Sequence, residues 1–241
     1  MQEIILHHKE EFRELLETYQ PSERAKQLLT QIPLVTLQGI TGGGRNTIIN
    51  YLVEHMSYQH VISDTTRPPK MRDGRMEQHG EAYFFRTEEE MLHDLHEGMM
   101  LEAELIHEQQ VSGVSVRELE RVQSIGRTPI NEVARGGIEN IRRIKPNTLF
   151  FFITPPDYDI WIDRLTKREV MTDEEFANRK QSAILELQTA LEADFYAFVV
   201  NNTVEQAARD IEDTRLNGID QERQEHGRRA AQAILDELTA R

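Results

Sequence analysis

A short apolar segment that runs directly into a glycine-rich loop, and from there into a helix, constrains this sequence most. Residues 34–38 read LVTLQ and are β-prone, and residues 39–47 follow as GITGGGRNT. Apolar residues then recur at helical spacing over residues 46–56, at Ile48, Ile49, Leu52 and Val53. Strand, glycine loop and helix in this order are the context that a phosphate-binding loop requires. A glycine turn that binds nothing is the disfavoured alternative.

The loop has the spacing G-x-x-x-x-G-K-[ST], with Arg45 at the lysine position and Asn46 at the Ser/Thr position. Glycines allow backbone N–H groups to surround a phosphate, and the following helix adds its positive N-terminal end. We therefore predict that the phosphates of ATP bind here. The predicted set is Gly39, Gly42, Gly43, Gly44, Arg45, Asn46 and Thr47. Arg45 keeps the positive charge that catalysis needs, and Asn46 offers an amide oxygen to Mg²⁺.

Composition excludes several classes of function. The chain has 241 residues, a formal net charge of −14 and no cysteine. The negative charge disfavours binding to nucleic acid or to an anionic membrane, and the lack of cysteine rules out disulfides, thiolate catalysis and cysteine zinc sites. No apolar run approaches the roughly 20 residues of a membrane span. A cytoplasmic protein, monomeric or homodimeric, is expected.

Apolar strands alternate with amphipathic helices, which predicts an α/β fold with a parallel sheet covered by helices on both faces. Strands are expected at residues 34–38, 60–63, 149–153 and 198–200, with residues 149–153 central in the sheet. Residues 65–80 are rich in proline, glycine and charge and are expected to form a loop, and Pro129 weakens the strand expected around it. Capping boxes at Thr87/Glu90 and Thr172/Glu175 predict two helix starts. The expected domains are an N-terminal helical extension (1–31), a main domain (32–215) and a C-terminal helical extension (216–241).

Six segments in order resemble guanylate kinase over roughly residues 33–213. Besides the loop, residues 63–70 (SDTTRPPK) resemble its Ser-x-Thr-Thr-Arg-x-Pro-Arg, and residues 80–85 (GEAYFF) its Gly-x-x-Tyr-x-Phe, after a few extra residues. Residues 98–107 (GMMLEAELIH) resemble its Gly-x-Phe-Leu-Glu-x-x-x-Val-His. Residues 151–156 (FFITPP) resemble its Ile-Phe-Ile-x-Pro-Pro, and residues 164–179 resemble its lid.

This resemblance implies the P-loop nucleoside monophosphate (NMP) kinase fold, with an NMP-binding region at about 63–116 and a lid at about 164–180. It implies transfer of the γ-phosphate of ATP, with Mg²⁺, to GMP, dGMP or a related monophosphate. Arg67, Lys70 and Tyr83 would hold the acceptor phosphate, while Glu102 and Ser63 would contact guanine. The lid arginines that would neutralise the transferring phosphoryl group are Arg168 and Arg179.

Other residues depart from the family pattern. A phosphate-binding tyrosine is missing from residues 110–115 (QVSGVS), and the hydroxyl that reads guanine is either lost to Val114 or displaced to Ser115. Glu132 stands where the family has an Asp near Mg²⁺, and a second Asp is replaced by Ala134. The alternative function is therefore a catalytically impaired domain that binds a nucleotide or a protein. A metal site built from histidines is disfavoured, because no pair has an obvious third ligand.

Overall fold

The computed structural model describes residues 5–72, 74–133, 135–146, 148–168 and 171–240. Contacts divide the chain into two units. The first comprises Met1–Leu34 and Gln59–Thr148, and the second comprises Val35–Tyr58 and Leu149–Arg241. No helix among the described residues is both long and apolar enough to cross a membrane.

Three parallel strands, in the order β11-β10-β1, form the centre of the second unit. They are β1 (Val35–Gln38), β10 (Leu149–Thr154) and β11 (Tyr196–Val200). Val35 is the register partner of Leu149, and Phe150 is that of Tyr196. The phenylalanines of β10 are all buried, as expected for a parallel strand covered on both faces. Strand β10 has a neighbouring strand on each side, so the prediction that residues 149–153 form an interior strand is confirmed.

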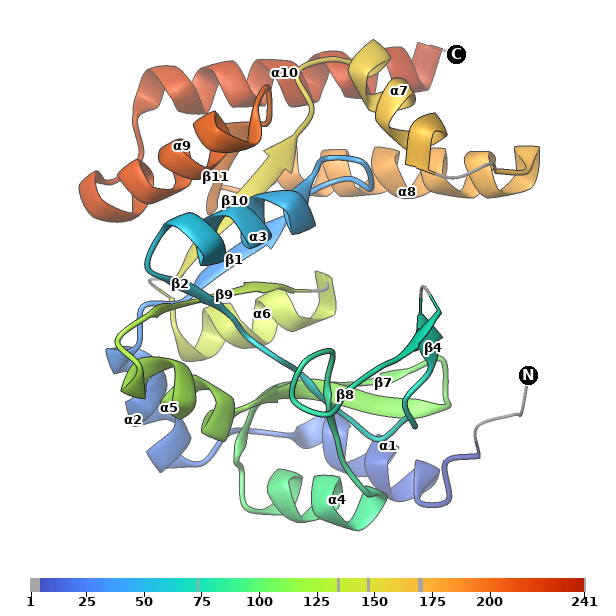
Figure 1. Ribbon diagram of the computed structural model, residues 1–241, viewed down its shortest axis with the longest axis vertical. Helices are drawn as coiled ribbons and strands as arrows, with labels where there is room; N and C mark the ends of the chain where they lie inside the picture. Colours follow the sequence, from blue (N-terminus) through green and yellow to red (C-terminus); the bar gives the residue numbers. More distant parts are fainter. Residues whose placement is uncertain (1–4, 73, 134, 147, 169–170, 241) are drawn as a thin grey trace. The chain divides into compact units, whose positions relative to one another are not determined.

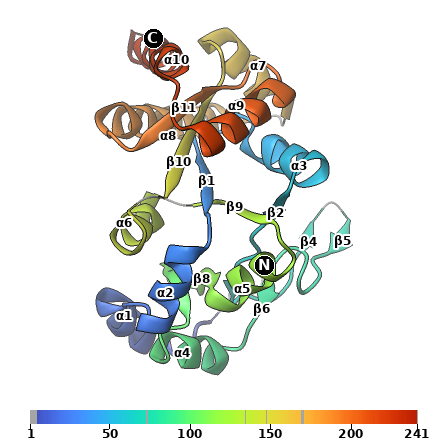
Figure 2. The ribbon, with the colours of Figure 1, turned by 90° about the vertical axis from the view of Figure 1, so that its left-hand side faces the viewer.

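The described residues of this unit form the helices α3 (Arg45–His55), α7 (Tyr158–Arg168), α8 (Asp173–Glu192), α9 (Val204–Asn217) and α10 (Gln221–Ala240). Figure 2 shows α8 on one side of the three strands and α3 and α9 on the other. Helix α8 begins with the predicted capping box, in which Thr172 and Glu175 each accept a hydrogen bond from the other's backbone N–H. Helices on both faces confirm the predicted layer arrangement in this unit.

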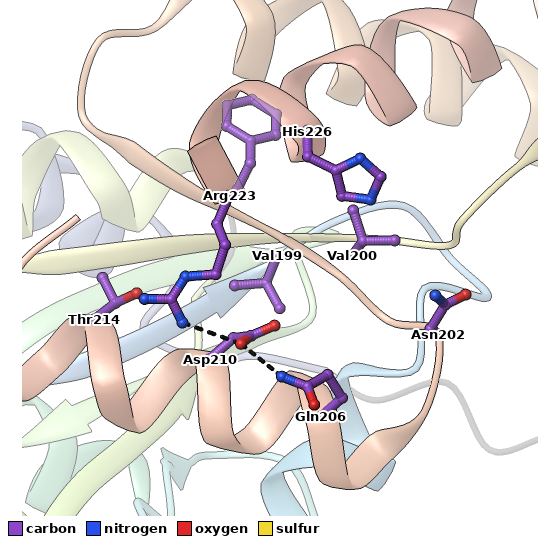
Figure 3. Close-up of a pocket in the computed structure, with 9 residues that line it drawn as sticks. Val199, Val200, Asn202, Gln206, Asp210, Thr214, Arg223 and His226 are labelled. Atoms are coloured by element: carbon purple, nitrogen blue, oxygen red, sulfur yellow. Dashed lines mark hydrogen bonds and ion pairs between the residues drawn. The ribbon is translucent and has the colours of Figure 1, made fainter. Parts of the chain in front are cut away.

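The C-terminal helix α10 covers the outer edge of β11 (Figure 1). Gln224 accepts a hydrogen bond from the Phe198 N–H at 2.9 Å and donates one to the Tyr196 carbonyl at 2.7 Å. The Gln224 amide thus makes the hydrogen bonds that a further strand would make at this edge of β11. A Cβ atom at Gly227 would lie 2.6 Å from Phe198 Cβ, so glycine permits this close approach. The close-up in Figure 3 shows the small pocket beside this contact, where Arg223 forms an ion pair with Asp210.

A four-stranded sheet in the order β6-β3-β8-β7 forms the centre of the first unit. Its strands are β3 (Asp64–Thr65), β6 (Phe84–Phe85), β7 (Met100–Ile106) and β8 (Gln110–Ser115). Strand β8 pairs antiparallel with β7 and β3, and β3 pairs parallel with β6. Strand β9 (Thr128–Glu132) follows later in the chain, and its Ile130 accepts a hydrogen bond from Val61, just beyond β2 (Tyr58–His60).

Two helices pack on one face of the four-stranded sheet. Phe12 of α1 (Lys9–Thr18) and Met91 of α4 (Glu88–His96) share a buried cluster with Ala103 and Val111 of the sheet. The capping box predicted at Thr87/Glu90 begins α4, as expected. The unit also contains α2 (Glu23–Gln31), α5 (Val116–Ser124) and α6 (Arg135–Ile144).

Three local details differ from what the sequence predicts. The strand expected at residues 60–63 ends at His60, and β2 begins earlier, at Tyr58. The loop expected at residues 65–80 contains a short hairpin, β4 (Met71–Arg72) paired with β5 (Arg75–Met76). Pro129 lies buried within β9, which forms despite it. Strand pairing is a tertiary contact, so these outcomes depend on neighbours that are distant in sequence.

Candidate functional site

The glycine loop after β1 has the backbone that a phosphate-binding loop needs. Gly42 and Gly44 have φ values of +88° and +94°, in the left-handed region that favours glycine. Gly44 is the N-cap of α3, so the first N–H groups of that helix face the loop. A Cβ atom on Gly39 would lie 2.1 Å from the Ile153 carbonyl oxygen, so only glycine fits there.

Side chains from α7 and from the end of β11 hold this loop. The indole N–H of Trp161 donates to the Thr41 carbonyl at 2.8 Å, and Asn201 Nδ2 donates to the Gly43 carbonyl at 2.8 Å. Arg164 Nη2 donates to the Asn201 carbonyl at 2.9 Å. Burial lowers the pKa of Arg164, while Asp157 and Asp163 oppose that shift. The loop is therefore supported by side chains that lie 120 and 158 positions away in the sequence.

Asn201 is a site candidate that the sequence reasoning missed, and Arg164 was placed in the lid segment without a role of its own. Within the described part of the chain, Asn201 Oδ1 and Arg164 Nη1 are buried and have no hydrogen-bond partner. Buried polar atoms without a partner are uncommon in folded proteins, which makes these two side chains candidates for a role at the loop. The only sequence signal for Asn201 is its position at the carboxyl end of a predicted strand.

The residues at the two altered loop positions lie in the first turn of α3. Arg45 is partly buried, and Asn46 and Thr47 are exposed. The amide oxygen of Asn46 and the hydroxyl of Thr47 are hard oxygen donors, which suit Mg²⁺. Glu132 ends β9 in the first unit and is partly buried, and Ala134 lies outside the described residues. Among the described residues, no three His, Asp or Glu side chains form a group that could hold a metal ion.

In the first unit, the structure brings Arg67 and Tyr83 together. Arg67 is 8% exposed, and its guanidinium lies 4.7 Å from the centre of the Tyr83 ring. Its two terminal nitrogens contact the two carboxylate oxygens of Glu77 at 2.6 and 2.9 Å. The hydrogen bonds to Glu77 raise the pKa of Arg67. Arg67 therefore already holds a planar anion in the bidentate geometry that also suits a phosphate.

Glu77 also organises the backbone around Lys70. Its carboxylate accepts the Lys70 N–H at 3.0 Å, and its own N–H donates to the Lys70 carbonyl at 3.0 Å. The Lys70 side chain is exposed, and Ser63 is partly buried just before β3. Sequence reasoning missed Glu77, because nothing in the sequence pairs it with an arginine ten residues away.

Glu102 lies on β7 and Val114 is its register partner on β8. Desolvation by burial raises the pKa of Glu102 to about 8; Glu104 adds to the shift, and a hydrogen bond with the Val114 backbone opposes it. Cross-strand partners share a face, so Val114 stands beside Glu102 and Ser115 points to the other face. There Ser115 hydrogen-bonds Asp64, whose pKa burial raises. The hydroxyl expected near the base is therefore lost to Val114 rather than displaced to Ser115.

A small hydroxyl network stands where the missing tyrosine was expected. The Thr65 and Ser112 hydroxyls lie 2.7 Å apart, and Gln110 Nε2 donates to the Ser112 hydroxyl at 3.2 Å. The three side chains thus hydrogen-bond one another.

Only part of the segment predicted to form a lid lies among the described residues. Arg179 lies on α8 and is partly buried, and Arg168 is the last residue of α7, with a side chain outside the described part. The Thr172 hydrogen bonds and, to a lesser degree, the charge of Arg179 lower the pKa of Glu175.

Comparison with known proteins identifies relatives over most of the chain. Residues 31–216 match the sequence model of a family described as Guanylate kinase. The guanylate kinase of Corynebacterium diphtheriae is 33% identical over 182 residues, which are 75% of this chain and 92% of that protein. That of Sus scrofa is 30% identical over 171 residues, 70% of this chain and 83% of that protein. The crystal structure of guanylate kinase from Anaplasma phagocytophilum has a TM-score of 0.53 and 23% identity, covering 80% of this chain and 88% of that one.

Proposed function

The chain belongs to the guanylate kinase family, and we propose that it transfers the γ-phosphate of ATP to GMP or dGMP. It is a guanylate kinase-like nucleoside monophosphate kinase, a phosphotransferase with the expected α/β P-loop fold. The observation that carries the proposed acceptor chemistry is the buried Arg67 guanidinium, which holds a planar anion in a bidentate contact. The cytoplasm, where nucleotides are interconverted, is the proposed location.

The donor phosphates would bind the glycine loop. The first N–H groups of α3, behind Gly44, supply hydrogen-bond donors and the positive end of the helix dipole. Arg45 supplies the charge at the position of the usual lysine. Asn46 and Glu132 are the proposed Mg²⁺ residues, and the ion would neutralise charge on the β- and γ-phosphates. The hard oxygen donors of Asn46 and Thr47 fit such an ion.

The acceptor would bind in the first unit. Arg67, Tyr83 and Lys70 provide a guanidinium, a phenol and an ammonium, which together suit a phosphate dianion. Glu102 and Ser63 would contact the base. An ionised carboxylate accepts the N1–H and the exocyclic amine of guanine together, and adenine lacks that pair of donors.

The reaction needs no nucleophilic side chain. An oxygen of the acceptor phosphate attacks the γ-phosphorus in line, the bond from that phosphorus to the β-phosphate oxygen breaks, and ADP leaves as the nucleoside diphosphate forms. Catalysis consists of positioning and charge neutralisation. Arg45, Arg168 and Arg179 are the proposed sources of positive charge for the transferring group.

A panel of acceptors tests the proposal. The protein is incubated with ATP, Mg²⁺ and one of GMP, dGMP, IMP, AMP, CMP or UMP, and ADP release is followed by a coupled assay. We expect turnover with GMP and dGMP above all others. No turnover with any acceptor at high protein concentration would refute the proposal, and binding without turnover would support an impaired binding module, which the comparisons do not favour.

A matched pair of variants separates the acceptor site from general surface charge. Arg67→Gln should lower kcat/KM for GMP roughly 50-fold, because charge-assisted hydrogen bonds to the phosphate are lost. Arg75→Gln is the control, since that side chain is 73% exposed and its carboxylate partner Glu81 lies at 3.5 Å. It should leave kcat/KM unchanged. Equal losses in both variants would contradict the assignment of Arg67.

A further inference from the structure

The strand that carries Glu102 contains an irregularity just before it. Met100 pairs with Ser115, but Glu102 pairs with Val114, so Leu101 is an extra residue and the register shifts between Met100 and Glu102. In a regular strand, residues two apart share a face. Here Met100 packs into the buried cluster under α1 and α4, while Glu102 turns to the other face. The bulge thus decides which way Glu102 points.

Strand β7 is the last strand in the sheet order, so its outer backbone groups face away from the other three strands. At the bulge, the Tyr19 hydroxyl occupies this edge. It donates a hydrogen bond to the Met100 carbonyl at 2.7 Å and accepts one from the Met100 N–H at 2.9 Å. One hydroxyl therefore satisfies both backbone polar groups of the residue at which the register shifts.

Tyr19 is also electrostatically close to Glu102. Burial raises the pKa of Tyr19 to about 12, and the charges of Asp94 and Glu102 add to the shift. Tyr19 therefore stays a neutral hydroxyl that can both donate and accept near neutral pH. Its ring packs against the same cluster as Met100.

The segment that carries Tyr19 is anchored on both sides. Before it, Glu88 accepts the backbone N–H groups of His7 and His8 at 3.0 and 2.7 Å. After it, Ser22 donates its N–H to the Gly98 carbonyl at 2.9 Å. A Cβ atom on Gly98 would lie 2.4 Å from Ser22 N, so glycine allows this close contact. These contacts fix where the Tyr19 hydroxyl lies.

We propose that Tyr19 is a positioning residue for recognition of the acceptor base: its hydroxyl holds Met100 and so fixes the bulge that turns Glu102 toward the base. Residue 19 precedes the region that matches the family, which begins at residue 31. This inference rests on the proposed function, because it gives Glu102 the task of reading the base. A slip of one residue in β7 would turn Glu102 toward the apolar cluster.

The test is a change in base selectivity. Hypoxanthine lacks the exocyclic amine, so IMP offers Glu102 one donor where GMP offers two. Tyr19→Phe keeps the ring and removes the hydroxyl. We expect kcat/KM for GMP to fall about fivefold, through KM, while that for IMP falls less and KM for ATP stays unchanged. The GMP/IMP ratio of kcat/KM therefore falls.

Three controls separate positioning from general loss of stability. Tyr58→Phe removes the hydroxyl of another buried tyrosine, which donates to Glu212, and should lower stability without changing the GMP/IMP ratio. Leu16→Ala loosens α1 against the same cluster but keeps the Tyr19 hydroxyl, and should also leave the ratio unchanged. In a Glu102→Gln background, Tyr19→Phe should have no further effect on the ratio.

The possible outcomes are distinct. If the wild-type protein prefers GMP and Tyr19→Phe keeps the same ratio, the positioning role is overturned and the proposed function stands. If the GMP/IMP ratio of kcat/KM falls by the same factor in Leu16→Ala as in Tyr19→Phe, the proposed role of the Tyr19 hydroxyl is overturned. If the wild-type protein neither binds nor phosphorylates GMP, the proposed function is overturned and this inference with it.

Discussion

The acceptor affinity should depend on pH in the neutral range through Glu102. Desolvation by burial raises the pKa of this carboxyl to about 8. The carboxyl must be ionised to accept both donors of guanine. With that pKa, about a tenth of the free protein carries the ionised group at pH 7 and about half at pH 8. We therefore expect kcat/KM for GMP to rise about fivefold between pH 7 and pH 8.

The assay is coupled ADP release at subsaturating GMP between pH 6.5 and 8.5, with KM for ATP measured alongside. Glu102→Gln has no ionisable group at this position, so its kcat/KM for GMP should be lower and nearly independent of pH. A flat profile in the wild-type protein, or the same rise in Glu102→Gln, would show that Glu102 is not the group that titrates.

The same pKa has a consequence for stability. The folded pKa lies above the ordinary value of 4.5, so between those pH values the native state binds more protons than the unfolded state. The free energy of unfolding then falls as pH rises from about 4.5 to about 8, by at most about 1.4 kcal/mol per pH unit from this group. Glu102→Gln removes this loss. The free energy of unfolding of the variant, measured by urea denaturation, should therefore rise relative to that of the wild type as pH rises. A difference in unfolding free energy that stays constant with pH would contradict the raised pKa of Glu102.

Two further substitutions test the backbone arrangement. Gly39→Ala should destabilise the protein by about 3 kcal/mol or more, because its Cβ would lie 2.1 Å from the Ile153 carbonyl oxygen. Urea denaturation measures this loss of stability, and an unchanged unfolding midpoint would contradict the prediction. Gln224→Leu should cost about 2 kcal/mol, because the Phe198 N–H and the Tyr196 carbonyl lose their partner. Exchange of the Phe198 amide hydrogen should also become faster, and unaltered exchange would mean that the edge of β11 is closed by other contacts.

The local parts of the fold could be predicted because their causes lie within a few residues. The capping boxes at Thr87/Glu90 and Thr172/Glu175 are complete within four positions, and both begin helices as expected. The strand, glycine loop and helix around Gly44 likewise depend on neighbouring residues. The hairpin β4–β5 was missed because proline, glycine and charge also describe an ordinary loop.

Within the candidate site, the sequence predicted the types of group but not their partners. Arg67 was expected to bind an anion, yet only the structure shows its guanidinium on Glu77. The sequence left open whether the hydroxyl that reads guanine is lost to Val114 or displaced to Ser115, and the register of β8 against β7 places Val114, not Ser115, beside Glu102. Asn201 was not considered, because it contacts Gly43 across a separation of 158 residues.

The sequence by itself determined the α/β class, the phosphate-type loop and the relationship to the guanylate kinase family, since periodicity, glycine spacing and ordered motifs are written along the chain. Only the tertiary structure decided what the two terminal helical segments contact. Tyr19 closes the outer edge of β7 and Gln224 closes that of β11, each by bonding both an N–H and a carbonyl of the strand. Every residue except proline carries the same backbone N–H and carbonyl groups, so the sequence alone does not indicate which side chain will hydrogen-bond with them.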